Sequence, residues 1–241
     1  MSELRIYAHR GASGYSLENT WKAFRKAGES GVGIELDLQI TKDGVVIVYH
    51  DDNLKRLSGK NLKIVEAEYS LLKELKIGKR WHRRFWHDSI PLGYEVIQWA
   101  KEKKVPLNIE LKSSFAKHPD GPRIIASMLE GAEDFHVSSF HTELLRDMKT
   151  LLPEAEMALI IKKRIPLALL EGMDWVDSIH LHKRLYSRQF LKALHGRKKT
   201  VRVYGIRGRE TAMKKLVPEL KGIITDYPHR VMKKLRPPSK G

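Results

Sequence analysis

The 241-residue chain contains no cysteine. This absence excludes disulfide bridges, thiolate zinc sites and a cysteine nucleophile. The chain also lacks a run of about 18 apolar residues, the length that a transmembrane helix needs. Its first residues lead into a strand-like run, without the apolar stretch of a signal peptide. We therefore expect a cytoplasmic protein with no transmembrane segment, and peripheral contact with a membrane stays open.

Acidic residues are few relative to basic ones. The chain has 29 Asp and Glu against 45 Lys and Arg, a formal net charge of +16. Such an excess attracts phosphate esters, nucleic acid or acidic lipid head groups. The basic clusters, at residues 80–84, 162–164, 197–199 and 233–236, are scattered between predicted elements. This scatter favours a solvated basic surface, and we expect no nucleic-acid partner.

Short apolar runs alternate with helical patterns along the chain. We predict eight strands, at residues 5–9, 33–37, 107–112, 135–139, 157–161, 179–182, 201–206 and 222–226. Helical patterns fill most of the gaps, for example at residues 21–30, 94–103, 142–151, 187–195 and 210–216. This alternation predicts an α/β fold, a single-domain (β/α)₈ barrel over residues 1–241, which is the TIM-barrel architecture. The alternative is an open doubly wound sheet, but no Gly-x-Gly-x-x-Gly sequence follows the first strand.

One stretch after the second strand departs from this alternation. Asp43-Gly44 lies between two strand-like runs, which is typical of a hairpin. We expect residues 45–50 to turn back along the second strand, so that His50 returns to the neighbourhood of Glu35. Residues 51–89 lack a βα unit and are interpreted as a small insertion over the barrel mouth. The tail, residues 236–241, is expected to be disordered.

Acidic side chains lie on two strands that neighbour each other in the predicted barrel. Glu35 and Asp37 are two residues apart, so both point to the same side of their strand. Glu110 and Lys112 share this spacing on the next barrel strand. A parallel barrel strand has no solvated face, and three carboxylates converging inside it would repel one another unless a cation neutralises them. Oxygen ligands without cysteine favour one divalent cation, Mg²⁺ or Ca²⁺, over zinc.

Two histidines are predicted to lie near these carboxylates. His9 ends the first strand, and His50 ends the hairpin, where Asp51 follows it. Histidine exchanges a proton near neutral pH, so the two are the candidate acid and base, with the roles unassigned. Arg10 and Lys112 are candidate partners for phosphate oxygens, because Arg offers a planar fork of donors and Lys a point charge.

The segment before the first predicted helix reads Glu18-Asn19-Thr20. Asn19 or Thr20 could cap that helix. Glu18 could instead support the site by holding Arg10 from behind. Together with Asp51, Glu18 and Asn19 are therefore candidates for positioning the groups that touch the substrate.

Taken together, these motifs resemble the glycerophosphodiester phosphodiesterase family. Their order and spacing cover nearly the whole chain. They are His9-Arg10-Gly11, Glu18-Asn19-Thr20, Glu35-Leu36-Asp37, Lys42-Asp43-Gly44, His50-Asp51, Asn108-Ile109-Glu110-Leu111-Lys112, Ser138-Ser139-Phe140 and Gly222-Ile223-Ile224-Thr225-Asp226-Tyr227-Pro228. 

The resemblance implies a barrel with a small insertion and a divalent cation held by Glu35, Asp37 and Glu110. It implies that His9 and His50 act as acid and base, while Arg10 and Lys112 bind phosphate. It further implies hydrolysis of diesters such as glycerophosphocholine and glycerophosphoethanolamine to sn-glycerol 3-phosphate and an alcohol.

Two segments differ from the family pattern. Residues 91–95 replace a Leu-Glu-Glu-like run, which should affect a helix start rather than catalysis. Near the seventh strand, Tyr204-Gly205-Ile206-Arg207 replaces a Trp-Thr-Val-Asn-like run. This position would line the alcohol side of the pocket, so Tyr204 is a candidate substrate-binding residue. His180 is another, although His182 has the same strand parity and we expect one of the two only to pack.

Other functions stay open. A lysophospholipase D or a phospholipase C-like enzyme could use the same barrel, with Trp81, Phe85 and Trp86 forming an apolar channel. A nucleic-acid-binding protein would account for the charge, but not for three carboxylates that repel phosphate in the absence of a metal. In the favoured reaction, the attacking oxygen belongs either to water or to the 2-hydroxyl of the substrate glycerol. We expect a small-molecule diester as the ligand and make no prediction of oligomeric state.

Overall fold

The computed structural model describes residues 4–79, 85, 87–210 and 216–235. Several predictions lie outside these described residues: those for Trp81, Trp86, the basic cluster at 80–84, most of the helix at 210–216 and the tail at 236–241. Among the described helices, none has the length and apolar character needed to cross a membrane.

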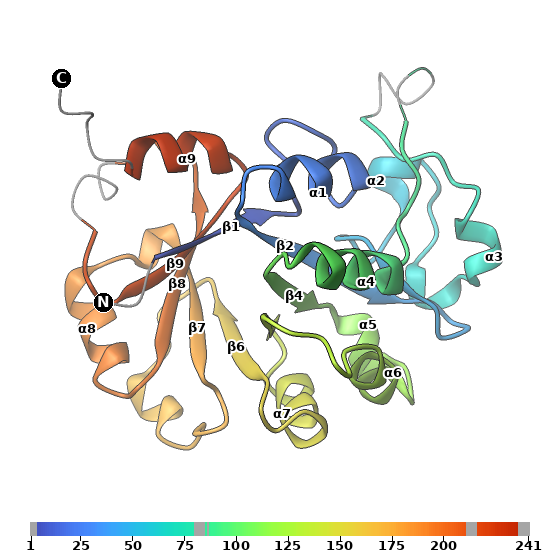
Figure 1. Cartoon of the computed structure of the whole chain (residues 1–241). Helices are drawn as coiled ribbons and strands as arrows, with labels where there is room; N and C mark the ends of the chain where they lie inside the picture. The colour runs from blue at the N-terminus through green and yellow to red at the C-terminus, as the bar shows by residue number, and fades with distance from the viewer. Residues whose placement is uncertain (1–3, 80–84, 86, 211–215, 236–241) are drawn as a thin grey trace.

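Eight parallel strands in the described part of the chain close into a barrel (Figure 1). They are β1 Arg5–His9, β2 Gly33–Ile40, β4 Leu107–Leu111, β5 Phe135–Ser139, β6 Glu156–Ile161, β7 Ser178–His182, β8 Thr200–Ile206 and β9 Leu220–Thr225. Each pairs with the next strand of the ring, and β1 pairs with both β2 and β9. The predicted barrel is confirmed, and the open doubly wound sheet is wrong, because an open sheet would leave two edge strands unpaired.

Helices cover the outside of the barrel between successive strands (Figure 1). They are α1 Trp21–Gly28, α4 Gly93–Lys103, α5 Ser113–Lys117, α6 Gly121–Met128, α7 Thr142–Leu151, α8 Arg188–His195 and α9 Pro228–Leu235. Short 3₁₀ turns, η2 Leu167–Leu170 and η3 Lys183–Leu185, follow β6 and β7. Apolar residues three or four positions apart give a helix one buried face. In α7 this face holds Leu144, Leu145 and Met148.

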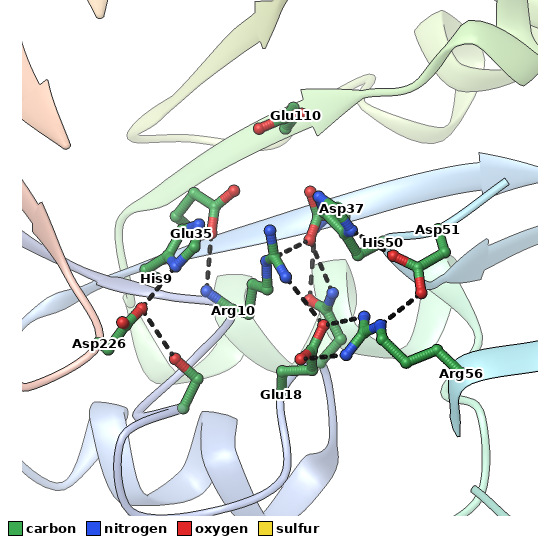
Figure 2. A network of polar contacts seen from close by, with 12 residues as sticks. His9, Arg10, Glu18, Glu35, Asp37, His50, Asp51, Arg56, Glu110 and Asp226 are labelled. Carbon is green, nitrogen blue, oxygen red and sulfur yellow. Dashed lines mark hydrogen bonds and ion pairs between the residues drawn. The ribbon is translucent and has the colours of Figure 1, made fainter. Parts of the chain in front are cut away.

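Alternation along each strand divides the barrel wall into two faces. In β2, Ile34, Leu36 and Leu38 belong to the main apolar core. Glu35 and Asp37 occupy the alternate positions and point into the barrel (Figure 2). Because helices cover the outer face and the ring encloses the inner one, every residue of β2 is buried. The inward charges must therefore find partners inside the barrel.

An antiparallel strand, β3 Val46–Val48, follows β2 and forms the predicted hairpin. Gly44 in the turn has a φ of +81°, a left-handed conformation that favours glycine. The Tyr49 N–H donates to the Asp37 carbonyl at 3.0 Å. This pairing lengthens β2 to residue 40, three residues past its predicted end. It also carries His50 back beside the acidic residues of β2.

The inserted segment lies beside the barrel, where the hairpin leaves it (Figure 1), and contains a second, smaller apolar cluster. The segment around this cluster holds α2 Lys55–Ser58, η1 Ile64–Glu66 and α3 Tyr69–Leu72. Leu54 and Ile64 are fully buried in the cluster, which reaches β3 through Ile47. The inserted segment therefore has its own core, and that core holds α2 close to the end of the hairpin.

Candidate active site

Three buried carboxylates meet inside the barrel (Figure 2). Glu35 and Asp37 come from β2 and Glu110 from β4, and the parallel register sets Asp37 opposite Glu110. One oxygen from each carboxylate lies within 4.8 Å of the others. Acids from two distant parts of the chain thus share one small volume, as the strand spacing predicted.

The ionisation of these carboxylates differs with their neighbours. Burial, reinforced by the charges of Asp37 and Glu110, raises the pKa of Glu35 to about 8 despite the nearby His9. Burial would raise the pKa of Asp37 as well, but Lys112 and Arg10 hold it well below its usual range. Glu35 Oε1 has no hydrogen-bond partner among the described residues. A buried polar oxygen without a partner is costly, so this oxygen is suited to a cation that displaces the proton of the carboxyl.

The donor set fits a hard divalent cation. All three side chains offer oxygen, the ligand that Mg²⁺ and Ca²⁺ prefer. In the part of the chain that the structure describes, no other group of three His, Asp or Glu side chains brings its ligand atoms this close. Lys112 Nζ lies 2.7 Å from Asp37 Oδ1 and also contacts Glu110. The protein therefore supplies part of the compensating charge itself, through the residue expected to bind phosphate.

His9 is held by a carboxylate from the last strand of the barrel. Its Nδ1 lies 2.7 Å from Asp226 Oδ1, which also accepts a hydrogen bond from the Ser13 hydroxyl at 3.2 Å (Figure 2). Burial disfavours the imidazolium, but Glu35 and the hydrogen bond to Asp226 outweigh it and raise the pKa of His9. With Nδ1 engaged, Nε2 is the ring nitrogen left for a substrate.

His50 is held in the same way by its neighbour in the chain. Its Nδ1 lies 2.7 Å from Asp51 Oδ1. Burial, helped by the positive charges of Arg10 and Lys112, lowers the pKa of His50 despite the opposing effects of Asp37 and of the hydrogen bond to Asp51. The two imidazoles thus lie in unlike electrostatic environments, one favouring the charged ring and the other the neutral ring.

Arg10 connects the acidic centre to the loop before α1. Its backbone N–H donates to Glu35 Oε2 at 2.7 Å, and its guanidinium lies 2.9 Å from Glu18 and 3.1 Å from Asp37. Its φ of +55° is unusual for a residue other than glycine, and such conformations concentrate at functional sites. Thr20 caps α1 by accepting a hydrogen bond from the Ala23 N–H.

Asn19 is therefore not the cap of α1. Its side-chain amide donates to Asp37 Oδ2 at 2.8 Å instead. The segment before α1 thus has both of the roles expected for it. Thr20 caps the helix, while Glu18 and Asn19 contact groups of the site.

Two residues that contact these groups were not among the candidate site residues of the sequence analysis. Asp226, which holds His9, lies 217 positions away from it along the chain. The position of Asp226 at the end of the last predicted strand could have indicated this contact, because a closed barrel sets the last strand beside β1. Arg56 on α2 donates to both oxygens of Glu18 and to Asp51 (Figure 2). No local pattern predicts that one guanidinium joins two such distant carboxylates.

A cavity of about 220 Å³ opens over this centre. His9, Arg10, His50, Glu35 and Glu110 line one side, and the other side is formed by Phe140, Ile160, Lys162, His180, His182 and Tyr204. His180 and His182 both line the cavity, so the expectation that one of them only packs is wrong. Alternate residues of β7 lie on the same face of the strand. Near the carboxyl end of a barrel strand, this face borders the open end of the barrel, where the cavity lies.

A larger cavity of about 580 Å³ lies between the loop before α1 and the inserted segment. Among the described residues that line it, Asp88 is the only carboxylate. Two residues of this cavity contact Asp226: the Ser13 hydroxyl donates to its side chain, and the Gly14 N–H donates to its carbonyl at 2.8 Å. The smaller cavity, with its carboxylates and two anchored imidazoles, is therefore the candidate active site.

Comparison with known proteins places this geometry in one family. Residues 9–230 match the model of the glycerophosphoryl diester phosphodiesterase family. A glycerophosphodiester phosphodiesterase of Bacillus altitudinis is 32% identical over 245 residues, covering 95% of this chain and 97% of the relative. Human lysophospholipase D is 38% identical over 112 residues, covering 44% of this chain and 35% of that protein.

Solved structures give the same result. A phosphodiesterase of Oleispira antarctica, solved with the product sn-glycerol-3-phosphate, superposes with a TM-score of 0.84 at 26% identity, over 95% of this chain and 96% of that one. A glycerophosphodiester phosphodiesterase of Thermotoga maritima has a TM-score of 0.78 at 27% identity, over 98% and 100%.

Proposed function

The chain belongs to the glycerophosphoryl diester phosphodiesterase family, and from this premise we propose that it hydrolyses glycerophosphodiesters in the cavity of about 220 Å³. The products are sn-glycerol 3-phosphate and an alcohol. The observation that carries the proposal is a pair of imidazoles, His9 and His50, that line the same cavity as the buried acidic trio. Each is anchored at Nδ1 by a carboxylate 2.7 Å away.

The two imidazoles perform the proton transfers. One removes the proton from the attacking oxygen, and the other protonates the leaving alkoxide. Asp226 and Asp51 keep each ring oriented, so that Nε2 is the nitrogen that exchanges the proton. Two separately anchored rings suit a reaction in which one proton is taken and another is given.

Negative charge builds up on the phosphoryl oxygens during this reaction and needs positive groups nearby. Arg10 and Lys112 are the protein's own cations at the site, each shared with Asp37. Glu35, Asp37 and Glu110 would hold Mg²⁺ or Ca²⁺, which supplies further positive charge when bound. Binding of the phosphate would draw Arg10 and Lys112 partly away from their carboxylates. A bound cation would compensate for this, because it would neutralise part of the charge of those carboxylates.

The test is the release of glycerol 3-phosphate from purified protein. We expect release that stops with EDTA and returns when Mg²⁺ or Ca²⁺ is added back. His141 is an exposed histidine outside the cavity, so His141→Ala is the matched control for His9→Ala and His50→Ala. No release from any glycerophosphodiester in the presence of either cation would refute the proposal.

The attacking oxygen is decided by a substrate analogue. If it belongs to water, a diester of 2-deoxyglycerol is cleaved at an unchanged rate. If it is the 2-hydroxyl of the glycerol, this analogue is inert and the normal substrate gives a cyclic phosphate first.

A lysophospholipase D activity is the second candidate. The observation that favours it is the larger cavity, which is lined by Tyr15, Leu17 and Phe85 and lies beside the Ser13 loop. Phe85 is 76% exposed and Tyr15 40%, so both are available to an acyl chain. Hydrolysis of a lysophospholipid faster than of its deacylated counterpart would establish this activity, and Phe85→Ser should then lower only the former rate.

A further inference from the structure

The cavity extends from the catalytic histidines to the opposite side of the barrel ring. His9 and His50 belong to β1 and the hairpin, whereas the far lining comes from β6, β7, β8 and the residues that follow β5 and β6. We call this far lining the distal wall and define it as Phe140, Lys162, His180, His182 and Tyr204. A diester bound between the catalytic histidines would place one of its two substituents against it.

The aromatic face of the distal wall already has a cation on it. Lys162 Nζ lies over the Phe140 ring, 4.4 Å from its centre. An aromatic face is the surface that a quaternary ammonium group such as choline would seek. Here an ammonium of the protein occupies it, so a cationic substituent would meet a like charge in place of an open ring.

The floor of the distal wall offers hydrogen bonds. His180 is 1% exposed, and neither of its ring nitrogens has a partner among the described residues. Burial, with His136 and Arg202 nearby, lowers the pKa of His180 well below its usual value, so the ring is neutral and can both donate and accept. An unpaired buried polar group is costly. A hydroxyl of the substrate would satisfy it.

The charges that act on His182 in the distal wall are positive. After burial, the positive charges of Arg184, Lys183 and Lys162 lower the pKa of His182. Two acids near the distal wall have basic partners. Glu210 forms an ion pair with Lys183 at 2.8 Å, and Glu156, whose charge acts on His180, forms an ion pair with Arg202. The described carboxylates that line the cavity, Glu35, Glu110 and Asp226, belong to the catalytic centre, and none of the three forms an ion pair with Lys162.

We propose that the distal wall binds the alcohol half of the diester and selects head groups that carry hydroxyls but no positive charge. Glycerol and inositol fit this description, whereas choline and ethanolamine do not. The inference rests on the proposed hydrolase function and narrows its substrate class. Lys162 repels a cationic head group, and His180 with the Tyr204 hydroxyl binds the hydroxyls of a neutral one.

The experiment compares kcat/KM for four diesters: glycerophosphoglycerol, glycerophosphoinositol, glycerophosphocholine and glycerophosphoethanolamine. We expect the wild-type protein to favour the first two by about tenfold or more, a typical effect of one like charge near a binding site. Lys162→Met keeps the apolar stem on Phe140 and removes the charge, so it should narrow the preference. Lys162→Glu should raise kcat/KM for glycerophosphocholine to that for glycerophosphoglycerol or above it. Added salt should weaken the preference of the wild-type protein for the uncharged head groups.

Lys163→Met is the matched control, because Lys163 is the next residue, carries the same charge and does not line the cavity. It should leave the ratios unchanged. Equal effects of the Lys162 and Lys163 variants, or a wild-type preference for choline while other diesters are also cleaved, would overturn the inference and leave the hydrolase function intact. Failure to cleave any of the four would refute that function, and the inference with it.

Discussion

Removing the guanidinium of Arg56 should slow turnover much more than it destabilises the fold. Arg56 donates to two oxygens of Glu18 at 2.8 and 2.7 Å and to Asp51 at 2.5 Å. Glu18 in turn holds Arg10, and Asp51 holds His50 (Figure 2). One side chain from the inserted segment therefore positions both a phosphate-binding group and a catalytic imidazole.

The magnitude follows from exposure. Shielded hydrogen bonds to charged groups contribute about 1.5–3 kcal/mol, whereas exposed ion pairs contribute about 0–1 kcal/mol. Because 45% of the Arg56 side chain is exposed, we expect Arg56→Ala to lower the free energy of unfolding by about 1 kcal/mol. For a chain of this length, that change lowers Tm by about 2–4 °C. Misplacing a catalytic group by about 1 Å can cost about 100-fold in rate, so kcat/KM should fall by about 10- to 100-fold.

The assay measures kcat and KM separately, with Tm measured beside them. Lys55→Ala removes the neighbouring positive charge, which pairs with no described carboxylate of the site, and is the matched control. Arg56→Lys should keep part of the activity, and added guanidinium at millimolar concentration should partly restore Arg56→Ala. The reasoning is refuted if Arg56→Ala has normal kcat/KM, or if Lys55→Ala loses as much.

The remaining predictions concern the catalytic centre. His9→Ala and His50→Ala should each lower kcat by about 10²–10⁴-fold, while calorimetry shows that cation binding is retained. With a substrate that has a p-nitrophenyl leaving group, which needs no proton to depart, the variant that lacks the general acid should lose much less. Because the pKa of Glu35 is raised to about 8, its carboxyl is protonated below that pH and a cation must displace the proton. Cation affinity should therefore rise from pH 6 to 8 with proton release, and a pH-independent affinity would contradict this. Asp226→Asn should lower kcat by about 10-fold or more with little change in KM, because the amide removes the charge that favours the His9 imidazolium and no longer fixes the tautomer of the ring. An unchanged kcat would show that the ring needs no charged partner.

Local pattern was enough to predict the strands and the hairpin. Glu35 and Asp37 stood out because a spacing of two puts both side chains on one face of a strand, and the parallel register then set Glu110 opposite Asp37. The Asp43-Gly44 turn likewise implied that His50 returns along β2. These outcomes depend on periodicity and turn chemistry, which are decided by residues near one another in the chain.

Contacts that depend on barrel closure were beyond such patterns. Asp226 meets His9 only because β9 and β1 are neighbours in a closed ring. Lys112 was expected to bind phosphate, and in the folded protein it contacts Asp37 and Glu110, the nearest buried charges. Sequence separation carries no information on such a choice, because it depends on which charges burial brings together.

What the chain determined by itself was the alternation of strands and helices, the face on which each charged side chain lies, and the family resemblance of its motifs. The tertiary structure decided which of those side chains meet, as when Arg56 bridges Glu18 and Asp51, and which have no hydrogen-bond partner among the described residues, as with the His180 ring. The physical reason is that backbone conformation follows from local sterics and hydrogen bonding. The partners and ionisation of a buried group follow instead from every charge and every shielding atom that the fold gathers around it.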